Sequence, residues 1–145
     1  MMKNFSREIA FFAVLAVFAV GVGCAGKPEN LPYPCELAGS VWRPADFRPG
    51  AYLEFTMDFR AVGSSGKNRF FAPVKCAPGK RIRVSPVAFS MIDGKLDDWE
   101  TTFFKALDNT RGYVFDDDRL ALYDEERRKL LEFRMMRPPR EVEKP

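Results

Sequence analysis

The sequence predicts a mainly β domain, an antiparallel barrel-like sheet with one amphipathic α-helix. Short segments in which apolar and polar residues alternate recur along the chain, and clusters of glycine, proline and aspartate separate them. A single stretch between them has apolar residues spaced with the period of a helix. Short strands with turns at close spacing are typical of an antiparallel sheet or barrel.

The first element is a leader, residues 1–23, which we interpret as a signal peptide. Lys3 and Arg7 precede an uncharged apolar run from Ile9 to Val22. As a helix, this run of about 14 residues would be about 21 Å long, shorter than the ~30 Å hydrocarbon core of a bilayer. The run therefore fits a cleaved signal peptide better than a membrane span.

The leader ends at Gly23-Cys24-Ala25-Gly26, which resembles a bacterial lipobox. In that motif signal peptidase II cuts before a diacylated cysteine, so we predict lipidation, as by palmitate, at Cys24. The motif usually has leucine where Gly21 stands. Two alternatives stay open: cleavage by signal peptidase I near Gly21 or Ala25, which releases a soluble protein, and an uncut anchor. Ala25 after the cysteine resembles lipoproteins sent to the outer membrane, facing the periplasm if the cell is Gram-negative.

Residues 24–36 follow as a tether with three prolines and no periodicity. The domain itself is predicted over residues 37–137. A disordered tail is predicted over residues 138–145, because Pro138 and Pro139 cannot extend a strand ladder.

Within the domain, alternation defines the strands. In residues 51–55, Leu53 and Phe55 share one face with Ala51; in residues 80–89, Arg81 and Arg83 point outward. The acidic runs 116–118 and 124–126 are predicted as hairpin turns. The predicted strands are residues 37–43, 51–55, 60–63, 68–75, 80–89, 112–115, 119–123 and 129–135.

One helix is predicted over about residues 97–109. Asp97 and Glu100 form the pattern of a capping box. Trp99, Phe103 and Leu107 then recur on one stripe, and we expect this stripe, with Trp99 and also Trp42, in the core.

Composition excludes several classes of function. The chain of 145 residues contains no histidine, which excludes histidine-based triads and histidine-containing metal sites. Its formal charge of +3 does not favour a nucleic-acid partner. If Cys24 is acylated, Cys35 and Cys76 remain as a possible disulfide in an oxidising compartment, the alternative being two free thiols.

Several motifs follow one another in an order that is informative as a set. They are Leu37-Ala38-Gly39-Ser40-Val41-Trp42, Leu53-Glu54-Phe55, Val62 to Phe71, Phe103 to Leu107, Tyr113, Asp118 to Tyr123, and Leu131-Glu132-Phe133. This order resembles the META domain of the HslJ-like family, heat-shock-associated bacterial proteins that are often exported or lipid-anchored, over about residues 37–134. The resemblance implies a mostly β, barrel-like fold and an association with stress or drug tolerance, and it implies no catalytic residues.

The chain departs from the family at two positions. Lys67 stands where the family's Gly-Cys-Asn turn has its cysteine. The family's second cysteine should fall near residues 92–94, where this chain has none. We infer that this pair has been lost, and Cys35 with Cys76 is a candidate replacement elsewhere.

Polar clusters have structural interpretations that we prefer to chemical ones. The acids at 116–118 and 124–126 lack the spacing of a calcium loop, and Ser64-Ser65-Gly66-Lys67 lacks the spacing of a phosphate-binding loop. Asp93, Asp97, Asp98 and Glu100 lie close in sequence and could supply a catalytic acid pair, as in glycosidases. Helix capping accounts for Asp97 and Glu100 without such chemistry. We therefore predict no catalytic, cofactor-binding or metal-binding residue, and no enzyme.

Two functions remain. The first is a non-enzymatic envelope lipoprotein, a stress-related structural or interaction module that is held on the membrane by Cys24. Its partner would be another envelope protein or an anionic lipid, the latter facing Lys75, Lys80, Arg81 and Arg83. The second is a carrier of a small apolar ligand in a barrel cavity, suggested by 14 Phe, two Trp and four Tyr residues.

Overall fold

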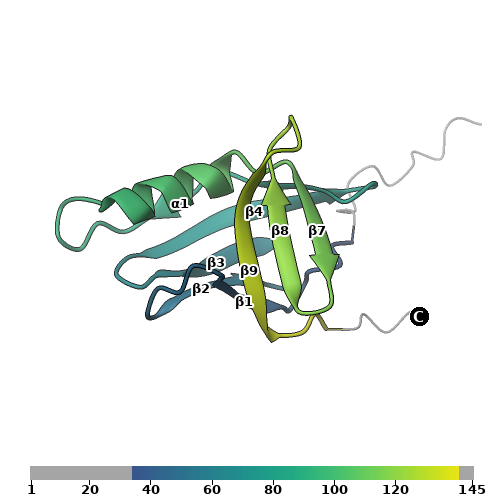
Figure 1. Cartoon of the computed structure of the whole chain (residues 1–145), viewed down its shortest axis with the longest axis horizontal. Helices are drawn as coiled ribbons and strands as arrows, with labels where there is room; N and C mark the ends of the chain where they lie inside the picture. Colours follow the sequence, from purple (N-terminus) through teal and green to yellow (C-terminus); the bar gives the residue numbers. More distant parts are fainter. Residues whose placement is uncertain (1–33, 141–145) are drawn as a thin grey trace, which may run out of the picture. The chain divides into compact units, whose positions relative to one another are not determined.

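A computed structural model describes residues 34–140 of the chain (Figure 1). The predicted signal peptide, Cys24 and most of the tether lie outside the described residues, as do residues 141–145. The described elements, in chain order, are β1 (Val41–Pro44), β2 (Ala51–Phe55), β3 (Arg60–Ser65), β4 (Arg69–Ala77), β5 (Arg81–Val84), β6 (Ala88–Phe89), α1 (Asp98–Asp108), β7 (Gly112–Asp116), β8 (Arg119–Tyr123) and β9 (Lys129–Arg137).

The strands form one antiparallel sheet that closes into a ring. The order is β3-β2-β1-β9-β8-β7-β5-β4-β6, and β3 also pairs with β4. Strand β4 is long enough to pair with β3 through its first half and with β5 through its second half, while β6 continues the β5 side. The predicted mainly β fold with one helix is confirmed.

The ring is weakest at the seam between β5 and β7. Only Arg81 and Gly112 are paired there, and the backbone bonds run from the Ile82 amide to the Arg111 carbonyl at 3.1 Å and from the Tyr113 amide to the Lys80 carbonyl at 3.0 Å. The other neighbours pair over at least two residues each, so the ring is not a regular barrel.

Two predicted strands differ from the observed ones. Residues 37–40 form a turn in which the Ser40 amide bonds to the Leu37 carbonyl, and Gly39 has a φ of +81°, so β1 begins only at Val41. The segment 80–89 is divided into β5 and β6, because Pro86 has no amide hydrogen to continue the ladder.

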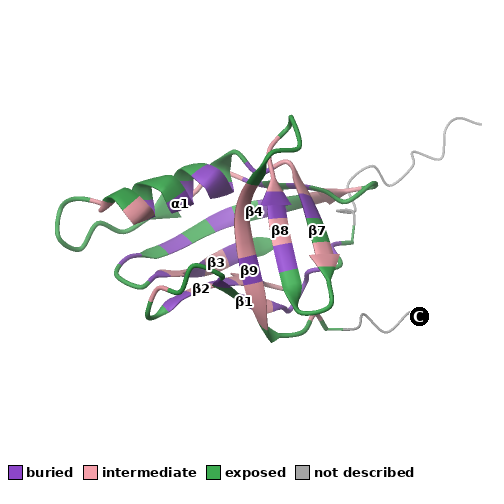
Figure 2. Ribbon diagram, in the orientation of Figure 1, coloured by how far each residue is buried: buried purple, intermediate pink, exposed green. Residues whose placement is uncertain are grey.

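Apolar side chains occupy the inside of the ring. Buried and exposed residues alternate along β4 (Figure 2), as the period of two requires. Trp42, Phe55 and Phe133 come from different strands and are at most 1% exposed. They belong to one continuous core that also includes side chains of α1.

The helix begins and ends as predicted. Asp97 caps it, and its side chain and that of Glu100 form the reciprocal bonds of a capping box. The rings of Phe103 and Phe104 meet the ring of Phe70 edge-on, at 5.5 and 5.6 Å between centroids. These contacts hold α1 against β4, above which it lies in Figure 1.

The two tryptophans differ in their burial. Trp42 is fully buried, as predicted, but Trp99 is only half-buried. One face of Trp99 stacks on Phe103 at 4.7 Å, whereas the Arg48 guanidinium covers the ring at 4.7 Å and Asp46 accepts its N–H at 2.8 Å. Trp99 thus lies at the edge of the core, because the neighbouring loop supplies polar partners.

The first residues of the predicted tail contact the domain. Residues 138–140 follow β9, and the Arg140 amide donates to the Ala38 carbonyl at 3.0 Å. This bond fastens the start of the tail to the turn before β1.

Candidate functional site

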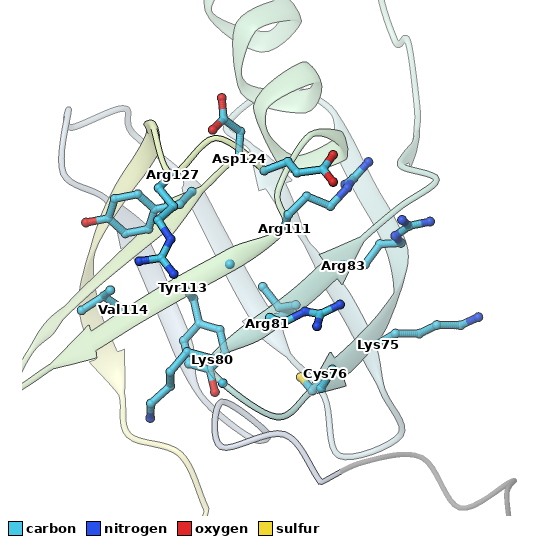
Figure 3. Close-up of a pocket in the computed structure, with 16 residues that line it drawn as sticks. Lys75, Cys76, Lys80, Arg81, Arg83, Arg111, Tyr113, Val114, Asp124 and Arg127 are labelled. Atoms are coloured by element: carbon cyan, nitrogen blue, oxygen red, sulfur yellow. The ribbon is translucent and has the colours of Figure 1, made fainter.

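A groove of about 840 Å³ opens on the outside of the seam between β5 and β7 (Figure 3). Its walls are the end of β4, the turn before β5, β5 itself, the start of β7 and the turn after β8. The sparse pairing at the seam explains the hollow, because a fully paired ladder would bring β5 and β7 together along their length.

Three exposed cations lie together on one wall of this groove. Strand alternation turns Ile82 and Val84 inward and leaves Arg81 and Arg83 outside. Lys75 of β4 is the direct antiparallel partner of Arg83. The three side chains extend toward the same side of the seam in Figure 3. We call Lys75, Arg81 and Arg83 the cation cluster.

No carboxylate within the described residues neutralises the cation cluster. None of its three side chains forms a salt bridge or a side-chain hydrogen bond there. Lys80, at the rim, differs because it pairs with Glu36. Like charges directly opposite each other on neighbouring strands repel, so the arrangement lowers stability unless an anion binds.

The chain enters the domain at this same groove. A disulfide joins Cys35 to Cys76, whose Cα atoms lie 5.4 Å apart, within the range that such a bond requires. Cys76 lines the groove next to Lys75. Glu36 adds bonds to Lys80 and, at 3.2 Å, to the Tyr113 hydroxyl. Residues 35 and 36 are therefore fixed to the groove wall.

The predicted basic set thus gathers at one site, but the sequence did not indicate the opposite wall. Arg111, Tyr113 and Arg127 line the groove from the far side of the seam. They lie near the cation cluster only because Arg81 pairs with Gly112, and the whole helix α1 separates these two residues in the sequence. No local pattern could have signalled it.

A second polar cluster is buried beneath the start of α1. The Glu100 carboxylate is inaccessible to solvent and accepts bonds from Ser65 Oγ at 2.5 Å, Asn68 Nδ2 at 2.7 Å and the Asp97 amide at 3.0 Å. Burial opposes ionisation of Glu100, but these bonds outweigh it, and its pKa lies below the ordinary value. We call these four residues the Glu100 cluster. With every buried polar atom in the described part satisfied, it has the character of a structural network.

Asp97 extends this network to the surface. Arg48 Nη1 donates to Asp97 Oδ1 at 3.0 Å, and Nη2 bonds to Oδ2. The Arg48 hydrogen bonds, followed by the bond from the Glu100 amide, lower the pKa of Asp97 to about 2. Asp97 is therefore an ionised helix cap, and the arrangement offers no proton donor at neutral pH.

An ion pair occupies the region in which the family resemblance implies two cysteines. Lys67 Nζ lies 2.6 Å from Asp93 Oδ2. Lys67 stands at the family's first cysteine position, and Asp93 lies within the stretch expected for the second. The contact still joins the hairpin after β3 to the loop before α1, through charge instead of a covalent bond.

The two acidic runs lie at turns, as predicted, although Asp116 is still the last residue of β7, and the structure keeps the runs apart. The run 116–118 lies at one end of β8 and the run 124–126 at the other. Asp118 pairs with Arg134 at 3.3 Å, and Asp124 with Arg128 at 2.8 Å. Within residues 34–140, no group of three or more candidate ligands lies close enough to hold a metal ion. Nor is any helix of that region long and apolar enough to cross a bilayer.

Comparisons with known proteins agree on the fold. Residues 36–137 match the family model of the META domain. A crystal structure of a DUF4847 family protein from Bacteroides vulgatus superposes with a TM-score of 0.55 at 15% identity, over 68% of this chain and 93% of that chain. At this identity the likeness shows the fold alone. No curated protein matches the sequence.

Proposed function

The chain belongs to the META-domain family, and we propose that it is a lipid-anchored protein of the cell envelope whose domain is a stress-related, non-enzymatic interaction module. The observation that carries this proposal is the cation cluster. It is an exposed set of charges without partners in the described part of the chain, at the place where the chain enters the domain.

The anchor is supported by the sequence before the domain. A charged start, a short apolar run and a small-residue motif around Cys24 are the parts of a lipoprotein signal. Acyl chains contribute ~0.8 kcal/mol per buried CH2, so several chains on one cysteine would keep a small domain on a membrane. Ala25 favours the outer membrane where the cell has one.

The interaction role is supported by the chemistry of the groove. Its lining carries six basic side chains and two acidic ones. Such an excess attracts an anionic partner.

The alternative of an apolar-ligand carrier requires free space inside the ring. Trp42, Phe55, Phe103 and Phe133 occupy that interior and are almost inaccessible to solvent. The groove lies outside the ring and is lined by charge, which suits an anion better than an apolar molecule.

Metabolic labelling with an alkyne fatty acid tests the anchor. We expect the wild-type chain to become labelled and Cys24→Ser to lose the label. Cys35→Ser is the matched control, because it also removes one cysteine but should keep the label. Equal labelling of the wild type and Cys24→Ser would contradict the proposal.

A further inference from the structure

We propose that the cation cluster docks the domain onto the phosphate groups of anionic lipids, in the same membrane that holds the anchor. This inference rests on the proposed lipid anchor and names the partner of the groove.

The spacing of the cations suits an array of phosphates. Lys75 and Arg83 are direct partners on adjacent strands, with Cα atoms about 4.5–5.5 Å apart. Arg81 lies two residues before Arg83 on the same outer face, about 7 Å away along the strand. Arginine can contact a phosphate through two parallel hydrogen bonds, and lysine adds a mobile point charge. Three neighbouring positive charges of this kind can engage more than one headgroup.

The tether brings this face to the membrane. About 11 residues separate Cys24 from Cys35, and a chain of that length reaches at most about 40 Å. The disulfide to Cys76 fixes the domain end of the tether beside Lys75. A lipid on Cys24 therefore keeps the groove, where the tether enters the domain, within about 40 Å of the bilayer surface.

An exposed aromatic residue lies on the same face. Phe71 lies on the same outward-facing side of β4 as Lys75, and 56% of its surface is accessible. Phe70, its neighbour, points into the core, so strand alternation places Phe71 on the outer surface. Aromatic side chains beside basic ones are typical of surfaces that bind at the bilayer interface.

Binding energies favour a membrane over a dissolved anion as the partner of the cation cluster. Each basic residue near an anionic leaflet contributes about 1 kcal/mol, which is a factor of about 5 in affinity. A tethered domain also meets the lipid surface at a high effective concentration. Three weak contacts are then sufficient for docking.

The test is lysine footprinting on the full-length processed protein, reconstituted into vesicles. One set contains phosphatidylcholine alone and the other adds phosphatidylglycerol. An amine-reactive reagent labels exposed lysines, and mass spectrometry measures each rate. We expect phosphatidylglycerol to slow labelling of Lys75 about fivefold or more. Lys105, exposed on α1, should keep its rate and serves as the internal control. Labelling of Lys75 at equal rates in both vesicles would overturn the proposal.

A pair of double variants attributes the effect to the groove. Arg81→Gln with Arg83→Gln should abolish the phosphatidylglycerol-dependent protection of Lys75. The control variant, Lys95→Gln with Arg119→Gln, removes the same amount of charge from exposed positions outside the groove. It should keep the phosphatidylglycerol-dependent protection of Lys75. An equal loss of Lys75 protection in both variants would show that net charge alone causes the binding, and would reject the groove as a specific docking face. Equal protection by dissolved glycerol phosphate, without anionic vesicles, would reject the lipid as the partner.

The same samples separate this inference from the anchor. Intact mass reports acylation of Cys24, and footprinting reports docking. Acylated protein without protection of Lys75 would overturn the docking face and leave the anchor. Unacylated protein that still binds phosphatidylglycerol vesicles through the cation cluster would reject the anchor and support the face.

Discussion

The Glu100 cluster and the cation cluster hold charged side chains in opposite environments, the first buried and the second exposed. Glu100 is fully buried, and three donors satisfy its carboxylate. The side chains of the cation cluster are exposed, and Lys75 and Arg83 face each other across adjacent strands without a carboxylate partner among residues 34–140. The first arrangement is part of the fold, since a buried carboxylate must have its hydrogen bonds satisfied. The second arrangement does not stabilise the fold, so we expect its binding partner to lie outside the chain.

The largest effect should come from the core. Trp42 is fully buried, donates to Ser40 Oγ at 2.6 Å and meets Phe115 edge-on at 5.5 Å. We expect Trp42→Ala to lower the free energy of unfolding by about 3–5 kcal/mol, measured by chemical denaturation. Trp99→Ala should cost less, because Trp99 is half-buried. A larger loss for Trp99 would show that the helix edge, and not the ring interior, dominates stability.

The disulfide belongs to the side of the cation cluster, because it links the point where the chain enters the domain to the groove wall. The bonded cysteines are separated by 41 positions. Replacing both by alanine should lower stability by about 2–4 kcal/mol, because the unfolded chain gains freedom. Denaturation of the double variant measures the loss, and thiol counting on the denatured, non-reduced wild type should find neither Cys35 nor Cys76 free. Two free thiols would contradict the bond.

Acid should reduce the contribution of the Glu100 cluster to the free energy of unfolding. The pKa of Asp97 is lowered from 3.8 to about 2, and that of Glu100 is also lowered, so both groups stabilise the fold while ionised. Their contribution is complete above the unfolded pKa values and is lost as pH falls from about 4.5 toward about 2. Arg48→Met removes the main cause of the Asp97 shift and should make denaturation midpoints less dependent on pH in that window. An unchanged pH dependence would reject the role of Arg48.

The smallest effect should have the opposite sign. Lys75→Gln removes the repulsion with Arg83, and the unfolding free energy should rise by a few tenths of a kcal/mol. Lys105→Gln is the control on an exposed helix position with no such neighbour. A clear loss of stability in Lys75→Gln would mean that the cation cluster serves the fold after all.

Sequence patterns predicted what depends on neighbours in the chain. The capping residues Asp97 and Glu100 marked the helix start, and alternation located the outward position of Arg81 and Arg83. These features follow from local periodicity and hydrogen bonding, which tertiary contacts did not override.

What the sequence could not predict depends on distant contacts. The half-burial of Trp99 is decided by Asp46 and Arg48, which lie about 50 positions earlier. The groove exists because β5 meets β7 at one residue pair across the helix. The contact of Lys67 with Asp93 likewise needs two loops to converge. Such pairings have no local signature, so they had to come from the structure.

We propose that the cation cluster outside the ring binds an anionic membrane. Thermal unfolding of the full-length protein in vesicles tests it most directly, because a ligand that binds only the folded state raises the midpoint. Phosphatidylglycerol should raise the Tm of the wild type by about 4–8 °C relative to phosphatidylcholine, the shift for about 1 kcal/mol in a domain of this size. The Arg81→Gln, Arg83→Gln variant should show no such rise. An equal rise in both proteins, or none in the wild type, would contradict the account.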